Sequence, residues 1–339
     1  MRFRHSRGSY EMVAATLKEA LDGLQNSFVI TDENVFRFWG AEIGDLPVHV
    51  VAAGERSKSL TVYDGCLQWL ASQRATRSST VVALGGGVIG DLAGFVAATY
   101  MRGIGLLQIP TSLLAMVDSS VGGKVGLDLE AGKNLVGAFF PPDHVALCME
   151  TLATLPVREF NNGAAEVWKY GAIMDEALFE TLEARPLGPG DERLPEIVVR
   201  SVDLKRQVVE DDEFETSGRR ASLNFGHTVG HALEVVTGYG PLLHGEAVSI
   251  GMVVEAAIGE RLQMTDGGTS QRIARGLASQ HLPVRVPGVD LATVVDAMRL
   301  DKKATAGNLA LALLDGFGSS RLVSDVPESV VLECLRENL

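Results

Sequence analysis

Short apolar runs alternate with amphipathic stretches up to about residue 155. The apolar runs are rich in β-branched residues and have the length of buried strands; they cover residues 28–31, 48–51, 80–84, 105–109 and 145–148. Between them, helical patterns cover residues 11–23, 59–73 and 91–101. This alternation predicts βαβ units, and therefore an α/β domain with a mainly parallel sheet.

The pattern changes after Pro156, where long stretches have the 3.6-residue periodicity of amphipathic helices. These stretches cover residues 157–184, 192–212, 219–237, 244–264, 268–280 and 290–300. A short β-like run at 309–314 and a last helix from Glu328 follow. We therefore predict two domains, an α/β domain over residues 1–155 and a mostly α-helical domain over residues 156–339, as the length of 339 residues also favours.

The composition is that of a globular protein, with 46% hydrophobic and 22% charged residues. No apolar run reaches the ~18 residues of a membrane span, and the N-terminus lacks the apolar core of a secretory signal, so we expect a cytoplasmic protein without membrane partners. The net charge of −13 argues against nonspecific nucleic-acid binding. Cys66, Cys148 and Cys334 form no CxxC pair and are expected to be buried thiols.

A glycine-rich turn follows the predicted strand 80–84. Gly85, Gly87 and Gly90 have the G-x-G-x-x-G spacing, in the strand–turn–helix context of a dinucleotide site. The same glycines could serve helix–sheet packing alone. An acid about 20 residues further on, which would hold a ribose, is missing here. Asp32, just past the first predicted strand, is the better candidate for that role.

Three of the seven histidines fall within residues 227–244, and each stands beside a glycine. His227 and His231 are four residues apart and share one helix face, so spacing alone favours them as a pair of metal ligands. Thr228 occupies the position of the glutamate in H-E-x-x-H, which argues against a zinc protease. Catalytic zinc usually has three protein ligands, and Glu166 is a candidate for the third.

Several lysines lie in glycine-rich or apolar segments, a common arrangement for binding phosphate. Each alone is more simply a solvated surface residue. The lysines in question are Lys124, Lys133, Lys169, Lys205 and the pair Lys302 and Lys303. Together with the histidine cluster, they predict a small, polyhydroxylated, phosphorylated substrate.

Nine strings of residues resemble, in order and spacing, the 3-dehydroquinate synthase family of sugar phosphate cyclases. They are GGGVIGD (85–91), YMRG (100–103), QIPTS (108–112), VDSSVGGK (117–124), GKN (132–134), LPVREF (155–160), AEVWK (165–169), LNFGHTVGH (223–231) and HGE (244–246). The resemblance extends from about Thr31 to Lys303, which is most of the chain.

The resemblance implies a Rossmann-like N-terminal domain, a helical metal-binding C-terminal domain and a homodimer. It implies a phosphate-eliminating carbon–oxygen lyase that converts 3-deoxy-D-arabino-heptulosonate 7-phosphate to 3-dehydroquinate and phosphate, in the shikimate pathway to aromatic amino acids. The implied steps are transient oxidation by NAD, phosphate elimination, re-reduction and intramolecular aldol closure. Zn²⁺, for which Co²⁺ can substitute, is the implied metal.

Site residues also follow from the resemblance, residue by residue. The implied metal ligands are Glu166, His227 and His244, and His231 moves to the substrate side. The implied NAD contacts are Asp32, Asn34, Glu55, Lys58, Gly86, Gly87, Asp91, Thr111, Ser112, Lys133, Thr154 and Leu155. The implied substrate contacts are Arg102, Asp118, Lys124, Asn134, Lys169, Lys205, Arg220, Asn224, His231 and Lys303, with Arg219 and Lys302 as rivals of Arg220 and Lys303.

Three other functions compete with this interpretation. An aminodehydroquinate synthase or another sugar phosphate cyclase would share most of these motifs. A metal-dependent polyol dehydrogenase would release NADH stoichiometrically and would not need the phosphate-binding lysines. A nucleotide-binding protein without catalysis would need neither the lysines nor the metal ligands.

Overall fold

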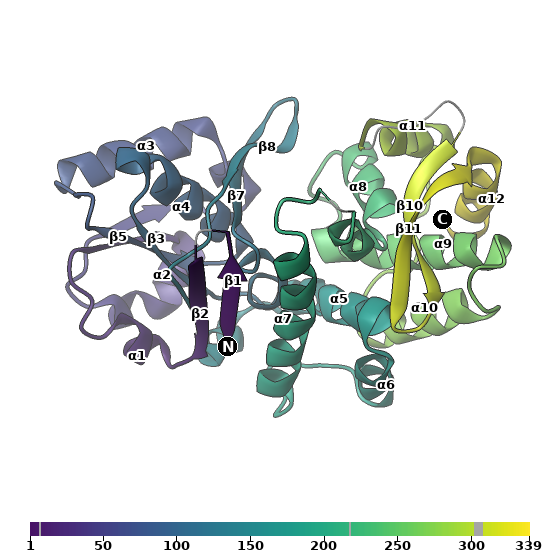
Figure 1. The fold of residues 1–339 in the computed structure, drawn as a ribbon, viewed down its shortest axis with the longest axis horizontal. Helices are drawn as coiled ribbons and strands as arrows, with labels where there is room; N and C mark the ends of the chain where they lie inside the picture. Colours follow the sequence, from purple (N-terminus) through teal and green to yellow (C-terminus); the bar gives the residue numbers. More distant parts are fainter. Residues whose placement is uncertain (7, 217, 302–307) are drawn as a thin grey trace. The chain divides into compact units, whose positions relative to one another are not determined.

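The computed structural model describes all 339 residues except Arg7, Ser217 and residues 302–307 (Figure 1). The chain forms two compact units. The first comprises residues 1–156 and 192–214, and the second comprises residues 157–191 and 215–339. Lys303, a predicted substrate contact, and its rival Lys302 lie outside the described residues.

A seven-stranded sheet forms the centre of the first unit, in the order β1-β2-β9-β6-β5-β3-β4 (Figure 1). Its strands are β1 (Arg2–His5), β2 (Gly8–Ala14), β3 (Ser27–Asp32), β4 (Val48–Val51), β5 (Thr80–Gly85), β6 (Gly105–Pro110) and β9 (His144–Leu147). All neighbouring pairs are parallel except β1 with β2. The five apolar runs predicted from the sequence are β3, β4, β5, β6 and β9, so the mainly parallel α/β sheet is confirmed.

Alternate residues of each central strand pack against helices on opposite faces of this sheet, as the two-residue period of a strand requires. Phe28 and Ile30 of β3 join one core with α3 (Leu60–Ser72) and α4 (Gly87–Thr99). Val29, between them, joins a second core with α1 (Leu17–Leu21) and the turn after α2 (Glu33–Trp39). Burial on both faces explains why these strands are continuously apolar in the sequence.

Two strand pairs of the first unit were not predicted. The helical pattern at 11–23 was wrong at its start, because β2 occupies 8–14 and buries alternate residues, Tyr10 and Met12. The glycine-rich segment after Gly123 forms an antiparallel hairpin of β7 (Lys124–Leu129) and β8 (Gly132–Phe139). This hairpin stands apart from the main sheet (Figure 1).

Helix α7 (Leu194–Asp211) lies in the first unit, which corrects its predicted place in a second domain over residues 156–339. It packs against the short helical turn η4 (Ala115–Ser119) and against β1. Polar contacts hold it there: Glu210 accepts a hydrogen bond from the backbone N–H of Arg4 at 2.8 Å. Lys205 is therefore a residue of the first unit.

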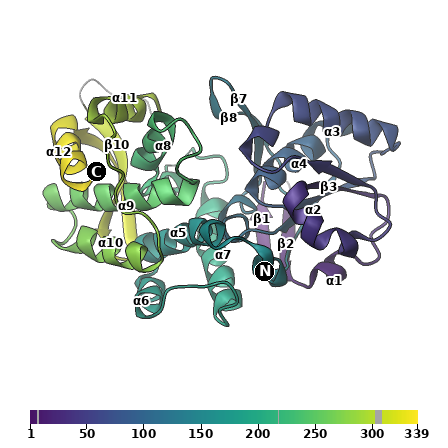
Figure 2. The ribbon, with the colours of Figure 1, turned by 180° about the vertical axis from the view of Figure 1, so that it is seen from behind.

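Helix α9 (His244–Arg261) is the central helix of the second unit, and α5, α8, α10 and α12 pack around it (Figure 2). The remaining elements are α5 (Val157–Met174), α6 (Glu176–Ala184), the turn η6 (Arg220–Asn224), α8 (His227–Val236), α10 (Thr269–Ser279), α11 (Leu291–Asp301), β10 (Asn308–Gly316), β11 (Ser319–Pro327) and α12 (Glu328–Asn338). The single helix predicted at 157–184 is two helices, because Asp175 caps α6 by accepting from the N–H of Leu178. The mostly helical character of this half is confirmed.

The three cysteines are buried and unbridged, as predicted. Within the described ranges, none of the helices is both long enough and apolar enough to span a bilayer.

Candidate active site

A buried carboxylate lies in the middle of α5. The side chain of Glu166 is 1% exposed, and Lys169, one turn further along the helix, pairs with its Oε2 atom. Neither oxygen of Glu166 accepts a directed hydrogen bond from the described residues. A buried carboxylate with unsatisfied oxygens is costly unless a cation lies against it. Lys169 is such a cation at Oε2, and Oε1 has no hydrogen-bond partner among the described residues.

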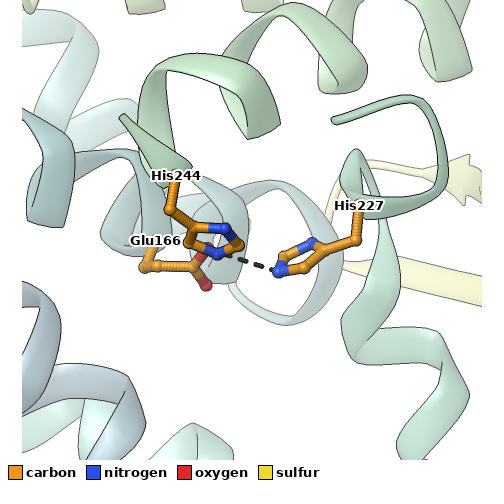
Figure 3. Close-up of side chains that lie close together, drawn as sticks. All are labelled: Glu166, His227 and His244. Carbon is orange, nitrogen blue, oxygen red and sulfur yellow. Dashed lines mark ion pairs between the residues drawn. The ribbon is translucent and has the colours of Figure 1, made fainter. Parts of the chain in front are cut away.

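Two imidazoles face this carboxylate (Figure 3). His227 is the first residue of α8, and its Nε2 lies 3.6 Å from Glu166 Oε1. His244 is the first residue of α9, and its Nε2 lies 3.8 Å from the same oxygen. One ligand atom from each of the three residues lies within 4.8 Å of the others. Three separate helices thus bring one oxygen and two nitrogens to a common point.

The electrostatics of His227 favour its neutral form. Burial lowers the pKa of His227 well below its usual value, and the positive charge of Lys169 and the two neighbouring histidines lower it further. Its Nδ1 lies 3.2 Å from the carbonyl oxygen of Phe225. A neutral imidazole with Nδ1 bonded to a carbonyl presents Nε2 as a lone-pair donor, which is the form that binds metals.

Glycines at the crossing of α8 and α9 allow the two histidines to approach. A Cβ atom on Gly251 would overlap the carbonyl oxygen of Gly226, and one on Gly230 would lie 3.1 Å from Val248 Cα. Gly226 has a φ of +80°, a left-handed conformation that favours glycine, and α8 begins at the next residue. The F-G-H-T-V-G-H string therefore encodes a close helix crossing as well as two imidazoles.

A third close contact joins α9 to α5. The backbone N–H of Gly245 donates to Asn162 Oδ1 at 2.5 Å, and a Cβ on Gly245 would overlap the carbonyl oxygen of Asn162. Asn162 lies one turn before Glu166 on α5. This contact fixes the start of α9, where His244 lies, beside the carboxylate.

Two buried acids near the histidines were missed in the sequence analysis. Glu255 of α9 accepts hydrogen bonds from the backbone N–H groups of Gly226 at 2.7 Å and Val229 at 3.1 Å, and so caps the first turn of α8. Glu234 of α8 lies 3.5 Å from His244 Nδ1. Both acids interrupt apolar stretches of their helices, a signal that could have marked them as buried polar residues with partners.

His231 does not join the group around Glu166. It falls in a second group of ligand atoms with Glu234 and His244, also within 4.8 Å of one another. The pairing of His227 with His231 that spacing favoured is therefore not the one that faces Glu166. Sequence spacing places two side chains on one helix face, but it cannot show that the start of another helix lies closer.

In the first unit, predicted NAD contacts gather around Lys58. Its Nζ lies 2.8 Å from Asp91 Oδ2 and 3.8 Å from Glu55 Oε1, and it donates to Asn134 Oδ1 at 2.5 Å. Lys133 lies 3.8 Å from the same Glu55 oxygen. Burial opposes the charge of Lys58, but Asp91 and Glu55 outweigh it and raise the pKa of Lys58, so the ammonium stays charged. Asn134, predicted to contact substrate, belongs to this cluster.

Of the two functions that the sequence left open for the glycine turn, the structure shows helix–sheet packing, and nucleotide binding stays a prediction. A Cβ on Gly85 would lie 2.6 Å from Ile89, so that glycine is required by packing. Gly86 and Gly87 begin α4, and Cβ atoms there would lie 3.4 Å from Ser112 Oγ and 3.1 Å from Ser119 Oγ. No side chain of the described residues caps the start of α4, so its first N–H groups are suited to an anionic group.

The remaining NAD contacts predicted in the first unit have visible structural roles. Asp32 caps α2 by accepting from the N–H groups of Asn34 at 2.9 Å and Val35 at 3.0 Å. The backbone N–H of Thr111 donates to Gly85 O, which places Thr111 and Ser112 beside the glycine turn. Thr154 accepts a hydrogen bond from Trp39 Nε1 at 2.9 Å, and Leu155 follows it directly at the end of this unit.

Among the predicted substrate contacts of the first unit, Asp118 and Lys205 form a pair. Lys205 Nζ lies 2.7 Å from Asp118 Oδ1 and also donates to the Asp118 carbonyl oxygen at 2.7 Å. Lys124, at the start of β7, and Arg102, which has a φ of +70°, are exposed. The structure therefore fixes Lys205 and leaves the other two cations at the surface.

In the second unit, Arg220 rather than Arg219 is the buried arginine. Arg220 is 4% exposed and its Nε lies 3.3 Å from Glu215 Oε1, whereas Arg219 is exposed. Asn224, half-buried, ends η6 three residues before His227. The structure thus distinguishes the two arginines by burial, and the assignment of Arg220 as the substrate contact stays a prediction.

Two family models together match residues 48–304, about three-quarters of the chain. The model for the 3-dehydroquinate synthase N-terminal domain matches residues 48–162, and that for the C-terminal domain matches residues 163–304. The 3-dehydroquinate synthase of Xanthomonas axonopodis pv. citri is 48% identical over 303 residues, 87% of this chain and 81% of the relative. That of Opitutus terrae is 46% identical over 91% of this chain and 88% of the relative.

Solved structures of other cyclases share the fold. A 2-deoxy-scyllo-inosose synthase complexed with carbaglucose-6-phosphate, NAD⁺ and Co²⁺ superposes with a TM-score of 0.88 at 25% identity, over 100% of both chains. A 2-epi-5-epi-valiolone synthase from Streptomyces hygroscopicus with NAD⁺ and Zn²⁺ bound gives 0.89 at 26% identity, over 98% of both chains. A probable glycerol dehydrogenase from Sinorhizobium meliloti, at 0.65 and 16% identity over 96% of both chains, shows likeness of fold alone.

Proposed function

The chain belongs to the 3-dehydroquinate synthase family, and we propose that it converts 3-deoxy-D-arabino-heptulosonate 7-phosphate to 3-dehydroquinate and phosphate. The observation that carries this proposal is the convergence of Glu166, His227 and His244, because it supplies a metal site where the reaction needs one. The identity of 45–48% to curated 3-dehydroquinate synthases, against 25–26% to the other cyclases, favours this activity within the superfamily.

The residues present fit a divalent metal ion. Two imidazoles and a buried carboxylate form the His₂Glu donor set of catalytic zinc sites, and Glu166 Oε1 faces both rings. We assign Zn²⁺ to this site, with Co²⁺ as a substitute. When bound, such an ion supplies Lewis-acid polarisation of substrate hydroxyl groups. Glu166 and Lys169 balance each other's charge, so the site adds little net charge of its own.

We assign NAD to the first unit. The start of α4, at Gly86 and Gly87, suits a pyrophosphate, and the Lys58 cluster of Glu55, Asp91 and Lys133 offers fixed polar groups to the rest of the nucleotide. The further contacts are Asp32, Asn34, Thr111, Ser112, Thr154 and Leu155. When bound, NAD supplies reversible hydride transfer, and because the hydride returns to the substrate, no net oxidation results.

We assign cations and hydrogen-bonding side chains as the substrate contacts. Asp118 holds Lys205 from two directions, which fixes the ammonium position for an anionic substrate group and reduces the entropy cost of binding. The other assigned contacts are Arg102, Lys124, Asn134, Lys169, Arg220, Asn224, His231 and Lys303. We further propose that the enzyme is a cytoplasmic homodimer of the shikimate pathway.

Stoichiometry distinguishes this activity from its rivals. With catalytic NAD and Zn²⁺, we expect one phosphate and one 3-dehydroquinate for each heptulosonate phosphate consumed, with no net NADH, because oxidation and re-reduction cancel. Phosphate is measured colorimetrically, NADH by absorbance and the product by mass spectrometry.

The same assay includes the amino analogue of the substrate and unphosphorylated polyols as controls. Steady accumulation of NADH with a polyol would identify a dehydrogenase and overturn the proposal. Faster turnover of the amino analogue would assign the chain to aminodehydroquinate synthase instead.

A further inference from the structure

Glu234 is a buried acid beside the proposed metal ligands and is not one of them. The residue is 5% exposed, and it projects from α8 within the apolar run of Ala232, Leu233 and Val235. Its Oε2 lies 3.5 Å from His244 Nδ1, while Nε2 of the same ring faces Glu166 Oε1 at 3.8 Å. His244 therefore lies between two carboxylates, one at each ring nitrogen.

A neutral imidazole carries a proton on one nitrogen and a lone pair on the other. A carboxylate at Nδ1 keeps the proton there and leaves the lone pair on Nε2, which points toward Glu166. His227 has the matching arrangement, since its Nδ1 lies 3.2 Å from the carbonyl oxygen of Phe225 and its Nε2 faces the same oxygen of Glu166. Both rings thus present Nε2 to one point.

We propose that Glu234 is a positioning residue that fixes the tautomer and orientation of His244 for metal binding. This inference rests on the proposed metal site of Glu166, His227 and His244. Acids behind metal-binding histidines orient the ring and raise its basicity, and their loss typically weakens metal binding by about 10–100-fold.

The geometry also offers Glu234 another role, as a ligand. Ligand atoms of His231, Glu234 and His244 lie within 4.8 Å of one another and could hold a second ion. If Nδ1 of His244, the nitrogen nearer Glu234, bound that ion while Nε2 bound the first, His244 would need a lone pair on both nitrogens and therefore an imidazolate, which is much harder to form than a neutral ring. Positioning needs only the neutral ring, so we favour it.

The test is a titration of the metal-free, full-length protein with Zn²⁺ against a competing chelator, which gives both affinity and stoichiometry. For the wild type we expect one ion per chain. Glu234→Ala should still bind one ion, about 10–100-fold more weakly. Glu234→Gln, which keeps an oxygen able to accept the Nδ1–H bond, should recover part of that loss. If Glu234 only stabilised the fold, Glu234→Gln and Glu234→Ala variants of equal stability should bind Zn²⁺ with equal affinity.

Glu260→Ala is the matched control. Glu260 lies on the same helix as His244, about 24 Å further along it, and accepts a hydrogen bond from the N–H of Ser270 at 2.6 Å. Its loss should lower the stability of the second unit but leave Zn²⁺ affinity within about 3-fold of the wild type, since it touches neither imidazole. Thermal unfolding of each metal-free variant verifies that it is folded.

Three outcomes would overturn the proposal. Unchanged affinity in Glu234→Ala, with one ion in the wild type, would remove the positioning role and leave the proposed function standing. Two ions in the wild type and one in Glu234→Ala would make Glu234 a ligand. No specific ion in the wild type would overturn the proposed metal site itself.

Discussion

Glu166→Gln is expected to lower turnover about 10³-fold and to abolish tight Zn²⁺ binding. Glutamine has the shape of glutamate but not its charge, so the substitution removes the anionic ligand from a buried site of two imidazoles. A Lewis acid contributes several kcal/mol to catalysis, and about 4 kcal/mol corresponds to that factor. The measurements are kcat with saturating substrate and the metal content of the purified protein.

Two control variants show whether the effect is specific to the ligand group of Glu166, His227 and His244. Glu183→Gln removes a carboxylate from an exposed pair with Arg272 in the same unit, and it should leave metal content and kcat unchanged. His231→Ala should keep its zinc, because His231 lies outside the group around Glu166. If Glu166→Gln retained stoichiometric zinc and near-normal turnover, the assignment of the ligands would be wrong.

Gly251→Ala is expected to destabilise the protein by about 4 kcal/mol or more, the range that marks severe disruption of a core. The added Cβ would overlap the carbonyl oxygen of Gly226 and lie 2.8 Å from its carbonyl carbon. These are backbone atoms, so no side chain can move aside, and α8 must separate from α9. Since His227 and His244 begin these two helices, metal affinity should fall together with stability, as measured by urea unfolding and Zn²⁺ titration.

Gly65→Ala is the matched control for this substitution. Gly65 lies within α3 of the first unit, and a Cβ there would meet nothing within 4 Å. Alanine has the higher helix propensity and should stabilise the protein by about 0.4–1 kcal/mol without changing metal affinity. If the urea midpoint of Gly251→Ala equalled that of the wild type, α8 and α9 would not be in the close backbone contact that the structure shows.

The parallel sheet could be predicted from the sequence because its strands are buried on both faces. Their residues are apolar without interruption, and glycine or polar segments separate them, so β3, β4, β5, β6 and β9 were found. β2 was mistaken for a helix start, since its alternation of Tyr10 and Met12 with exposed residues runs directly into α1. The β7–β8 hairpin was missed because Gly126 and Gly137 occupy paired positions on the two strands. A Cβ on either glycine would meet the backbone of the other strand, so these positions lack the side chains whose alternation indicates a strand.

Contacts between residues far apart in the sequence could not be predicted from periodicity or spacing. Periodicity identified α7 as a helix, but only its contacts with η4 and β1 show which unit it joins. Spacing likewise paired His227 with His231, whereas the glycine crossing of α8 and α9 brings His244 opposite Glu166. Resemblance to a known family supplied that pairing in advance, because it carries information on tertiary contacts that a single sequence lacks.

The most direct test of the account is anomalous diffraction at the zinc absorption edge, from crystals of the protein grown with Zn²⁺. The account predicts one strong peak per chain, within coordinating distance of Glu166 and of Nε2 of both His227 and His244. A peak lying instead between His231 and Glu234, or no peak near Glu166, would contradict it.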